Sequence, residues 1–573
     1  MDNHVRLKTL AMNRTFSVLV MLAVACPDVF GQKQPRKRIV ANPIELNYQF
    51  QPDSPSRREA ADPTCILFND SYYLFVSKSS GYWKSADLAK WTYIPCRSIA
   101  TINDYAPAVL AYKGTLYYTA SDRNRIFKNA HPDQDSWTEI PSKFQISEHD
   151  PYLFQDDDGK VYYYWGCSDV DPIMGVEVDP EDGFAPKGKP VVLIRHHAKD
   201  YGWENPGENN EADKDGWNEG PAMFKYEGRY YLQYAAPGTQ FRIYADGCYV
   251  GDSPLGPFTY IEDNPFSIKP GGFIAGAGHG DTFRDRYGNY WHVASMKISQ
   301  RHWFERRIGL FPVTLTDHGP VAHTVFTDYP FAIPDRQTDF SKTAMPDGYN
   351  LLSYGKAIQA SSALPEHGCS LANDEKVETW WSASTGRQGE WLRTDLGSKM
   401  EIKAIQANFA DDHFTVKAPA QPQPYRYRIE VSDDTERWTT IVDQSRNEED
   451  LPHRLHLLDR PVHARYVRIV NQCDLNGNFS LYDFRIFGTG NGPLPSRVRD
   501  VRISRNQRDG RSCKLTWAPL QNATGYIVSW GTDPKRLTHS TMTFDPYLDA
   551  NWYSRNATCY FYVKAFNENG VGE

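Results

Sequence analysis

Four residues in the first half of the chain could do chemistry together, because each stands at the start of one repeated pattern. They are Asp62, Asp150, Glu219 and His279. Three carboxylates that converge on one site repel each other, so a core selected for stability alone would not contain them. Cleavage of a glycosidic bond needs such a set, since one carboxyl protonates the leaving oxygen while another activates water. Their proximity also separates the pKa values, which leaves one carboxyl protonated near neutral pH.

The pattern around these residues occurs five times before residue 335. Each copy begins with a residue beside Pro or Gly, which we call the head of the copy. An apolar strand, a turn and an aromatic-rich strand follow the head. The copies begin at Ala61, Tyr105, His149, Asn218 and Gly278. The interval from Asp62 to Ala106 equals that from Ala106 to Asp150, and the next two intervals are longer. The third and fourth units therefore carry insertions.

Repeats of roughly 40–50 residues with about four strands are typical of β-propeller blades. Turn pairs such as Asn69-Asp70 and Lys113-Gly114 separate the strands, as hairpins require. We expect an all-β fold class, with a five-bladed β-propeller over residues 40–335 followed by two β-sandwich modules. The innermost strands of a propeller line a central channel, so the heads should point into one axial pocket. Aromatic pairs such as Tyr72-Tyr73 and Tyr117-Tyr118 recur once per unit, so the 14% aromatic content is in part a signature of the repeat.

The heads resemble those of glycoside hydrolase family 43. The tripeptides ADP, HDP, EGP and GHG occur in order, one per unit, within residues 40–335. The resemblance implies an inverting enzyme in which Asp62 is the general base and Glu219 the general acid, with Asp150 tuning the pKa and orientation of the acid. It also implies that His279 contacts a metal ion, often calcium. Inversion implies that the carboxyls of Asp62 and Glu219 are about 6.5–9.5 Å apart.

The second unit departs from the family, because Tyr105-Ala106-Pro107-Ala108 stands where many members have Trp-Ala-Pro-Asp. This leaves the catalytic set intact but changes a pocket wall. Taken singly, each head has a simpler explanation, such as a turn-forming Asp before Pro or a packed His; the four phased heads together favour a site. The acidic insertion 203–215 is expected to be a solvated loop that rims the pocket. Candidate sugar platforms, each with ordinary packing as the alternative, are Tyr105, Trp165, Trp203 and Trp217.

Two further modules follow the repeats. Residues 350–488 resemble a discoidin (coagulation factor 5/8 type C) domain, or family 32 carbohydrate-binding module, through TWW, EWLRTDLG and ARYVRIV in order. The resemblance implies carbohydrate binding and a structural Ca²⁺ near residues 373–379, although the module could simply pack against the propeller. Residues 496–573 resemble a fibronectin type III domain through LTWAPL, GYIVSWG and CYFYVKAFNENG. The chain stops where the last strand should begin, so we expect a truncated module that serves as a spacer.

Residues 1–31 are predicted to be a signal peptide, because basic residues precede an apolar run from Phe16 to Ala25 that is too short to span a bilayer. We expect an exported protein, periplasmic or extracellular, with a lipid anchor on Cys26 as the alternative, and no transmembrane segment. None of the nine cysteines forms a CxxC pair, which disfavours zinc and favours buried free thiols. A disulfide between Cys369 and Cys473, or between Cys513 and Cys559, is the alternative.

The net charge of −8 disfavours a surface that binds nucleic acid or an anionic membrane. Hydrophobic residues make up 40% of the chain and charged residues 23%, a composition that excludes wholesale disorder. We expect an exported inverting exo-glycosidase that releases terminal arabinofuranose from plant-type polysaccharide. The alternatives are a β-xylosidase, a β-galactofuranosidase and a non-catalytic glycan-binding propeller. The expected partner is an oligo- or polysaccharide, and the chain is expected to be a monomer. The chemistry is expected to require no cofactor. The two expected positions for a structural Ca²⁺ are near His279 and in the discoidin-like module.

Overall fold

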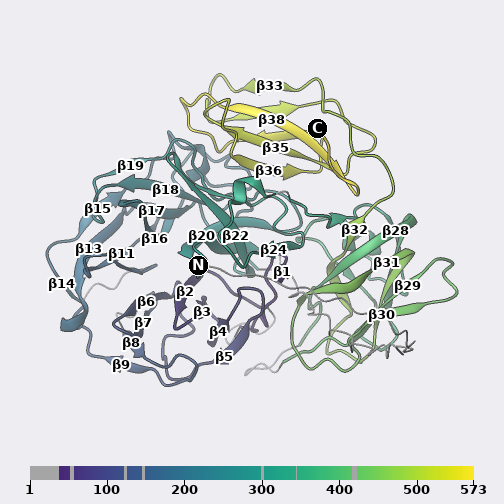
Figure 1. Cartoon of the computed structure of the whole chain (residues 1–573), viewed down its shortest axis with the longest axis horizontal. Helices are drawn as coiled ribbons and strands as arrows, with labels where there is room; N and C mark the ends of the chain where they lie inside the picture. The colour runs from purple at the N-terminus through teal and green to yellow at the C-terminus, as the bar shows by residue number, and fades with distance from the viewer. Residues whose placement is uncertain are drawn as a thin grey trace, which may run out of the picture. The chain divides into compact units, whose positions relative to one another are not determined.

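The structure of the chain is a computed structural model that describes residues 38–51, 57–121, 125–144, 149–298, 302–343, 345–415 and 422–573. The predicted signal peptide lies outside these residues. The described elements are β-strands and short 3₁₀ helices, which confirms the all-β fold class (Figure 1). Within the described residues, no helix has the length and apolar character needed to cross a membrane. The 3₁₀ helices are η1 (Pro180–Asp182), η2 (Gly202–Glu204), η3 (Phe340–Lys342) and η4 (Cys369–Ala372).

Five antiparallel units follow each other along the first part of the chain. Unit 1 contains β2 (Thr64–Phe68), β3 (Ser71–Phe75), β4 (Gly81–Ser85) and β5 (Thr92–Pro95). Unit 2 contains β6 (Ala108–Tyr112), β7 (Thr115–Thr119), β8 (Ile126–Asn129) and β9 (Thr138–Ile140). Unit 3 contains β10 (Tyr152–Gln155), β11 (Val161–Trp165) and β13 (Ile173–Asp179), with β14 (Ala185–Pro186) and β15 (Val191–Ile194) outside β13.

Unit 4 contains β16 (Asn218–Tyr226), β17 (Arg229–Ala236), β18 (Ala245–Gly251) and β19 (Phe258–Tyr260). Unit 5 contains β20 (Ala275–Arg284), β21 (Tyr290–Lys297), β22 (Arg306–Thr316) and β23 (Gly319–Ala322). The innermost strands β2, β6, β10, β16 and β20 contact one another in sequence, and β20 returns to contact β2. This closed ring of sheets is the β-propeller that the repeats predict (Figure 1). Strand β1 (Arg38–Val40) pairs with β24 (Phe331–Ile333) and so ties the two ends of the propeller together.

The predicted hairpin turns are confirmed. Asn69 and Asp70 connect β2 to β3 with φ of 45° and 59°, and Lys113 and Gly114 connect β6 to β7 with φ of 47° and 75°. Two successive left-handed residues give the turn whose twist matches that of the paired strands. The turn sequences therefore fix the register in which each aromatic strand meets its partner.

An eight-stranded sheet forms the second module. It contains β25 (Asn350–Leu351), β26 (Ala357–Ala360), β27 (Trp381–Ser382), β28 (Trp391–Phe409), β29 (Tyr427–Ser432), β30 (Thr439–Asp443), β31 (His453–Asn471) and β32 (Ser480–Thr489). Buried Trp381 and Phe409 lie in its core. Arg58 of the propeller is buried against this module and pairs with Asp411 and Asp450, each at 2.8 Å.

The third module has a three-stranded and a four-stranded sheet. The first contains β33 (Arg502–Arg505), β34 (Cys513–Thr516) and β37 (Tyr547–Ala550), and the second contains β36 (His539–Thr543), β35 (Gly525–Gly531), β38 (Tyr560–Asn567) and β39 (Gly570–Val571). The two residues of β39 pair with β38 at the edge of the second sheet.

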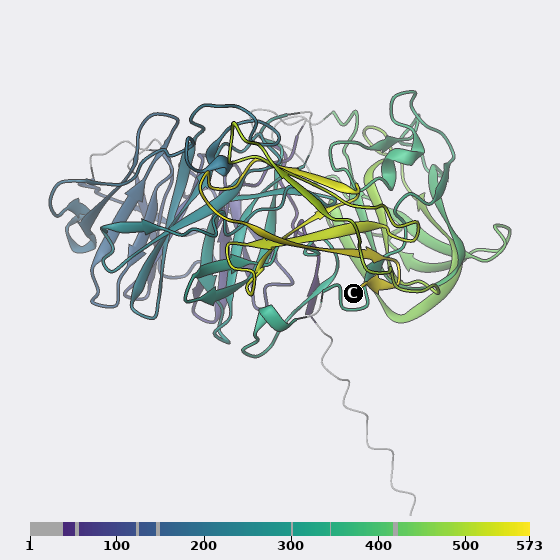
Figure 2. The same cartoon turned by 90° about the horizontal axis from the view of Figure 1, so that it is seen from above.

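The third module is not a spacer that stands away from the propeller. Trp203 and Trp552 lie in one hydrophobic cluster that both share, and Figure 2 shows its yellow strands against the teal strands of the propeller. The Gly202 N–H donates to the Tyr553 carbonyl at 3.1 Å. A Cβ at Gly202 would lie 2.0 Å from the Asn551 carbonyl oxygen, so only glycine permits this approach.

Candidate active site

A left-handed residue opens each blade at the propeller axis. The five are Asp62 (φ 50°), Ala106 (50°), Asp150 (53°), Gly220 (58°) and His279 (48°). This register corrects one sequence expectation, because the head of the fourth blade is Gly220 and Glu219 precedes it. A Cβ at Gly220 would lie 2.5 Å from the His279 ring, so glycine at this head makes room for the histidine.

Asp62 is buried and surrounded by donors. The Arg306 guanidinium lies 3.0 Å from Oδ1, and the Ser77 hydroxyl donates to Oδ2 at 2.6 Å. Burial alone would raise the pKa of Asp62, but Arg306 and then His279 hold it below its ordinary value. Asp62 is therefore an ionised carboxylate that can accept a proton.

Asp150 has the opposite character. Burial raises its pKa to about 6; His279 opposes the shift and Glu219 adds to it. The Gly220 N–H donates to Oδ2 at 3.2 Å, and the Ser121 hydroxyl lies 3.4 Å from Oδ1. Asp150 therefore changes its charge near pH 6.

His279 connects the two aspartates. Its Nδ1 lies 3.3 Å from Asp62 Oδ1 and 3.7 Å from Asp150 Oδ2. Burial alone would lower the pKa of His279, but Asp62 and Asp150 raise it above its ordinary value. Ca²⁺ takes six to eight oxygen ligands. The imidazole instead faces carboxylates that already pair with Arg306 and serines, so this donor set does not fit a calcium ion bound directly to His279.

Glu219 lies on β16 beside Asp150. Its Oε1 accepts from the Tyr244 hydroxyl at 2.5 Å, and its Oε2 accepts from the Cys167 thiol at 3.2 Å. Ligating atoms of Asp150, Cys167 and Glu219 all lie within 4.8 Å of one another. Neither the thiol nor the phenol was among the sequence predictions, because no motif marks them.

These side chains surround one cavity of about 170 Å³, with residues from all five blades around it. The predicted platform Tyr105 lies on its wall, with its ring centroid 5.9 Å from that of Phe304. The cavity therefore combines carboxylates, one guanidinium and aromatic rings. Its lining is Asp62, Tyr105, Ser121, His149, Asp150, Cys167, Glu219, Thr239, His279, Phe304 and Arg306.

The other predicted platforms do not line this cavity. Trp165 is 5% exposed and packs with Phe144 and Tyr163 in the core that the second and third blades share. Both faces of a blade are covered by its neighbours, so an aromatic residue on β11 packs there whichever way it points. Trp203 is fully buried under the third module, which also shows that the acidic insertion is anchored at its start rather than solvated throughout. Trp217 is 40% exposed and lies outside the lining.

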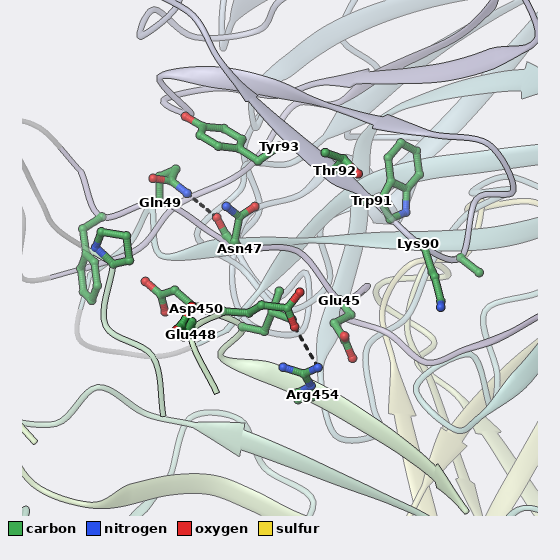
Figure 3. A pocket seen from close by; sticks show the side chains of 15 residues that line it. Glu45, Asn47, Gln49, Lys90, Trp91, Thr92, Tyr93, Glu448, Asp450 and Arg454 are labelled. Atoms are coloured by element: carbon green, nitrogen blue, oxygen red, sulfur yellow. Dashed lines mark hydrogen bonds and ion pairs between the residues drawn. The ribbon is translucent and has the colours of Figure 1, made fainter. Parts of the chain in front are cut away.

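A larger cavity, of about 580 Å³, lies between the first blade and the second module (Figure 3). Two of its acidic side chains are in ion pairs, since Asp450 binds Arg58 and Glu449 binds Arg454 at 2.9 Å. None of the predicted catalytic residues lines it. The predicted set of Asp62, Asp150 and Glu219 lies together only around the smaller axial cavity among the described cavities.

The second module has a possible cation position. Asp483 Oδ1 is buried and has no hydrogen-bond partner among the described residues, while its Oδ2 accepts from the Glu375 N–H at 2.9 Å. Asp374 lies close enough to raise the pKa of Asp483, after the larger effects of burial and Glu375. An orphaned carboxylate oxygen beside a second carboxylate fits Ca²⁺ chemistry, and Asp374 lies in the segment 373–379 where the resemblance places calcium.

The eight cysteines of the described residues are all free, so neither open disulfide pairing is present. Cys65, Cys96, Cys248 and Cys513 are buried and the other four are partly buried. This confirms the expectation of unpaired thiols.

Comparison with known proteins agrees with this geometry. The sequence model "Glycosyl hydrolases family 43" matches residues 56–320. Residues 56–320 are thus similar to the glycosyl hydrolases of family 43. The model "F5/8 type C domain" matches residues 357–483, so the second module is similar to that domain. The likeness of the third module to fibronectin type III stays a prediction.

The relatives of this chain include proteins named for different sugars. The chain is 26% identical over 317 residues to the β-D-galactofuranosidase xynD of Aspergillus niger, which covers 46% of this chain and 85% of that protein. It is 32% identical over 175 residues to a β-xylosidase of Xylanibacter ruminicola, covering 25% of this chain and 51% of that protein. A crystal structure of a thermostable family-43 glycoside hydrolase aligns with a TM-score of 0.42 at 22% identity, covering 52% of this chain and 100% of that one.

Proposed function

We propose that this chain is an inverting exo-glycosidase in which Glu219 is the general acid and Asp62 the general base. One observation carries the proposal: carboxyls from three blades line one small axial cavity, and the cation Arg306 pairs with only one of them. An inverting glycosidase needs this asymmetry, because one carboxyl must be ionised and another must carry a proton.

The neighbours of Asp62 suit it to the role of base. The cations Arg306 and His279 keep its pKa low, so the carboxylate is ready to take a proton from water. We assign the leaving-group proton to Glu219, which Tyr244 and Cys167 hold by one oxygen each. Asp150, whose carboxyl lies within 4.8 Å of that of Glu219, is proposed to orient the acid. No step in this scheme uses a metal ion.

The size of the cavity supports exo action. A volume of about 170 Å³ suits one terminal sugar ring rather than several consecutive units of a polymer. We propose terminal arabinofuranose as the sugar. The match that spans 85% of a β-D-galactofuranosidase makes terminal galactofuranose the second candidate, and the β-xylosidase match makes xylose the third.

The proposal extends to the rest of the chain. We propose that the F5/8 type C module binds carbohydrate and holds a structural Ca²⁺ through Asp374 and Asp483. We also propose that the protein is exported and works outside the cytoplasm as a monomer. The rival function is a glycan-binding propeller without activity, which the complete set of Asp62, Asp150 and Glu219 disfavours.

The experiment measures hydrolysis of aryl α-L-arabinofuranoside, β-D-galactofuranoside and β-D-xyloside by the full chain, by Glu219→Gln and by Glu227→Gln. Glu227 is an exposed glutamate in the β16–β17 turn of the same blade and serves as the matched control. We expect turnover of one substrate, a loss of at least about 100-fold in Glu219→Gln, and no loss in the control. Inactivity on all three substrates with retained glycan binding would favour the rival function.

A further inference from the structure

Cys167 is the direct cross-strand neighbour of Glu219. The two-residue strand β12 (Cys167–Ser168) pairs antiparallel with β16, and Cys167 stands opposite Glu219. Residues opposite each other in an antiparallel pair present their side chains on the same face. The thiol therefore reaches Glu219 Oε2 at 3.2 Å while Tyr244 reaches Oε1 from another segment.

Both partners of Glu219 stay protonated and so remain donors. Burial, and then the charges of Asp150 and Glu219, raise the pKa of the Cys167 thiol far above its ordinary value. Burial and then Glu219 raise the pKa of Tyr244 in the same way. Cys167 is thus neither a nucleophile nor a thiolate in this site.

The first two blades use serine for the corresponding task. Ser77 and Ser121 lie two residues beyond the ends of the second strands β3 and β7, and each donates its hydroxyl to an aspartate. The backbone N–H of each serine donates to the carbonyl of the residue just before the head of a blade. In the third blade, the backbone N–H of Gly166 makes the equivalent bond. The side chain that faces a catalytic carboxyl in this blade is therefore one residue later, at Cys167.

The change from hydroxyl to thiol has a chemical consequence. An S–H group is a weak donor, whereas an O–H group is a strong one. A strong donor to a carboxylate favours its charged form. Serine suits Asp62, which works as the ionised base, but it would draw the proton away from a carboxyl that must deliver one.

We propose that Cys167 is a positioning residue that fixes the orientation of Glu219 through packing and a weak hydrogen bond, so that Tyr244 is the one strong side-chain donor to the acid among the described residues. This inference rests on the proposed role of Glu219. The other titratable and charged groups that face the pair are Asp62, His149, Asp150, Tyr244, His279 and Arg306.

The experiment compares the pH dependence of kcat/KM for the wild type, Cys167→Ser and Cys167→Ala. Cys167→Ser should move the alkaline limb to lower pH by about 0.5 unit, because the hydroxyl stabilises the charged carboxyl. Cys167→Ala should leave that limb in place or move it to higher pH, and should lower kcat by roughly 3–10-fold. The loss in Cys167→Ala should be greater on aryl glycosides with poor leaving groups, which depend more on the acid.

Cys473→Ser is the matched control, since Cys473 is a partly buried free thiol in the second module. It should match the wild type in both pH profile and kcat. Identical alkaline limbs in Cys167→Ser and the wild type would overturn the inference, provided Tm shows that both are folded. If Glu219→Gln keeps full activity, the acid assignment itself fails; if Glu219→Gln is inactive while Cys167→Ser is unchanged, only the role of Cys167 fails.

Discussion

The guanidinium of Arg306 pairs with Asp62 at 3.0 Å and with the buried Glu59 at 2.7 Å. Strand β22 thus places a cation beside the head of the first blade, although Arg306 lies more than 240 residues after Asp62 in the chain. Arg306 is the largest of the influences that lower the pKa of Asp62 against the effect of burial.

Replacement of Arg306 tests that relationship. The cation lowers the pKa of Asp62, so Arg306→Met should raise that pKa and move the acid limb of the kcat/KM profile to higher pH. We expect kcat/KM to fall by roughly 10–100-fold as well. Arg306→Lys keeps the charge and should leave the acid limb near its wild-type position. An unchanged acid limb in folded Arg306→Met would refute the role of this pair.

Asp150 should couple stability to pH. Its pKa rises to about 6 in the fold from an ordinary value of 3.8, so the folded state binds more protons between these values. The stability that this group contributes is therefore complete below about pH 4 and is lost as pH rises through 6. Asp150→Asn has no carboxyl to titrate at this position, so it does not lose this stability. The Tm of the variant minus the Tm of the wild type should therefore increase from pH 4 to pH 7.

The control for Asp150 is Asp158→Asn, an exposed position in the hairpin turn of the same blade. Its Tm difference from the wild type should not increase over that pH range. Asp150→Asn should also lower kcat/KM by at least about tenfold, since the charge beside the acid is gone. A flat Tm difference for Asp150→Asn would contradict the account of its burial.

Arg58 should hold the propeller and the second module together. It is fully buried, and its loss leaves Asp411 and Asp450 without their cation. Arg58→Met should cost about 3–5 kcal/mol, read as a lower Tm, and Arg58→Met with Asp411→Asn should recover part of the loss. The exposed pair of Arg437 and Asp434 in the same module is the control, and Arg437→Met should cost less than about 1 kcal/mol. Equal effects of the two arginine variants would contradict this assignment.

Removal of divalent cations should separate stability from chemistry. If Asp374 and Asp483 hold Ca²⁺, excess EDTA should lower the Tm of the protein and added Ca²⁺ should restore it, while kcat stays constant. Asp374→Asn should make Tm insensitive to EDTA. Loss of kcat on chelation, reversed by Ca²⁺, would instead place a required metal at the axial cavity.

The repeats predict much of the fold for a local reason. Turn pairs such as Asn69-Asp70 and the aromatic strands act within a few residues, so each hairpin is visible in the sequence. The proposed catalytic aspartates are visible in the sequence because Asp62 and Asp150 each precede Pro at the head of a repeat, and both take a left-handed φ. Ser77 and Ser121, two residues after the second strands, recur in the same repeats and were a signal for the donors around the aspartates.

The rest depends on contacts between distant segments. Arg306 and Tyr244 reach the pocket from positions that carry no motif, and only the closed ring brings them to Asp62 and Glu219. Trp165 follows the packing alternative given for it, because an aromatic residue in a propeller strand is covered by the neighbouring blade. Trp203 is buried by a module that lies some 300 residues later, which no local pattern announces.

The stereochemistry of the first product tests the central claim most directly. Proton NMR should follow hydrolysis of an aryl α-L-arabinofuranoside, or of whichever aryl glycoside the substrate panel selects, before mutarotation equilibrates the anomers. The account predicts the inverted anomer first, which is β-L-arabinofuranose from the α-substrate, because Asp62 activates water on the face opposite Glu219. Initial release of the α-anomer would show retention and contradict the assignment of Asp62 as base and Glu219 as acid.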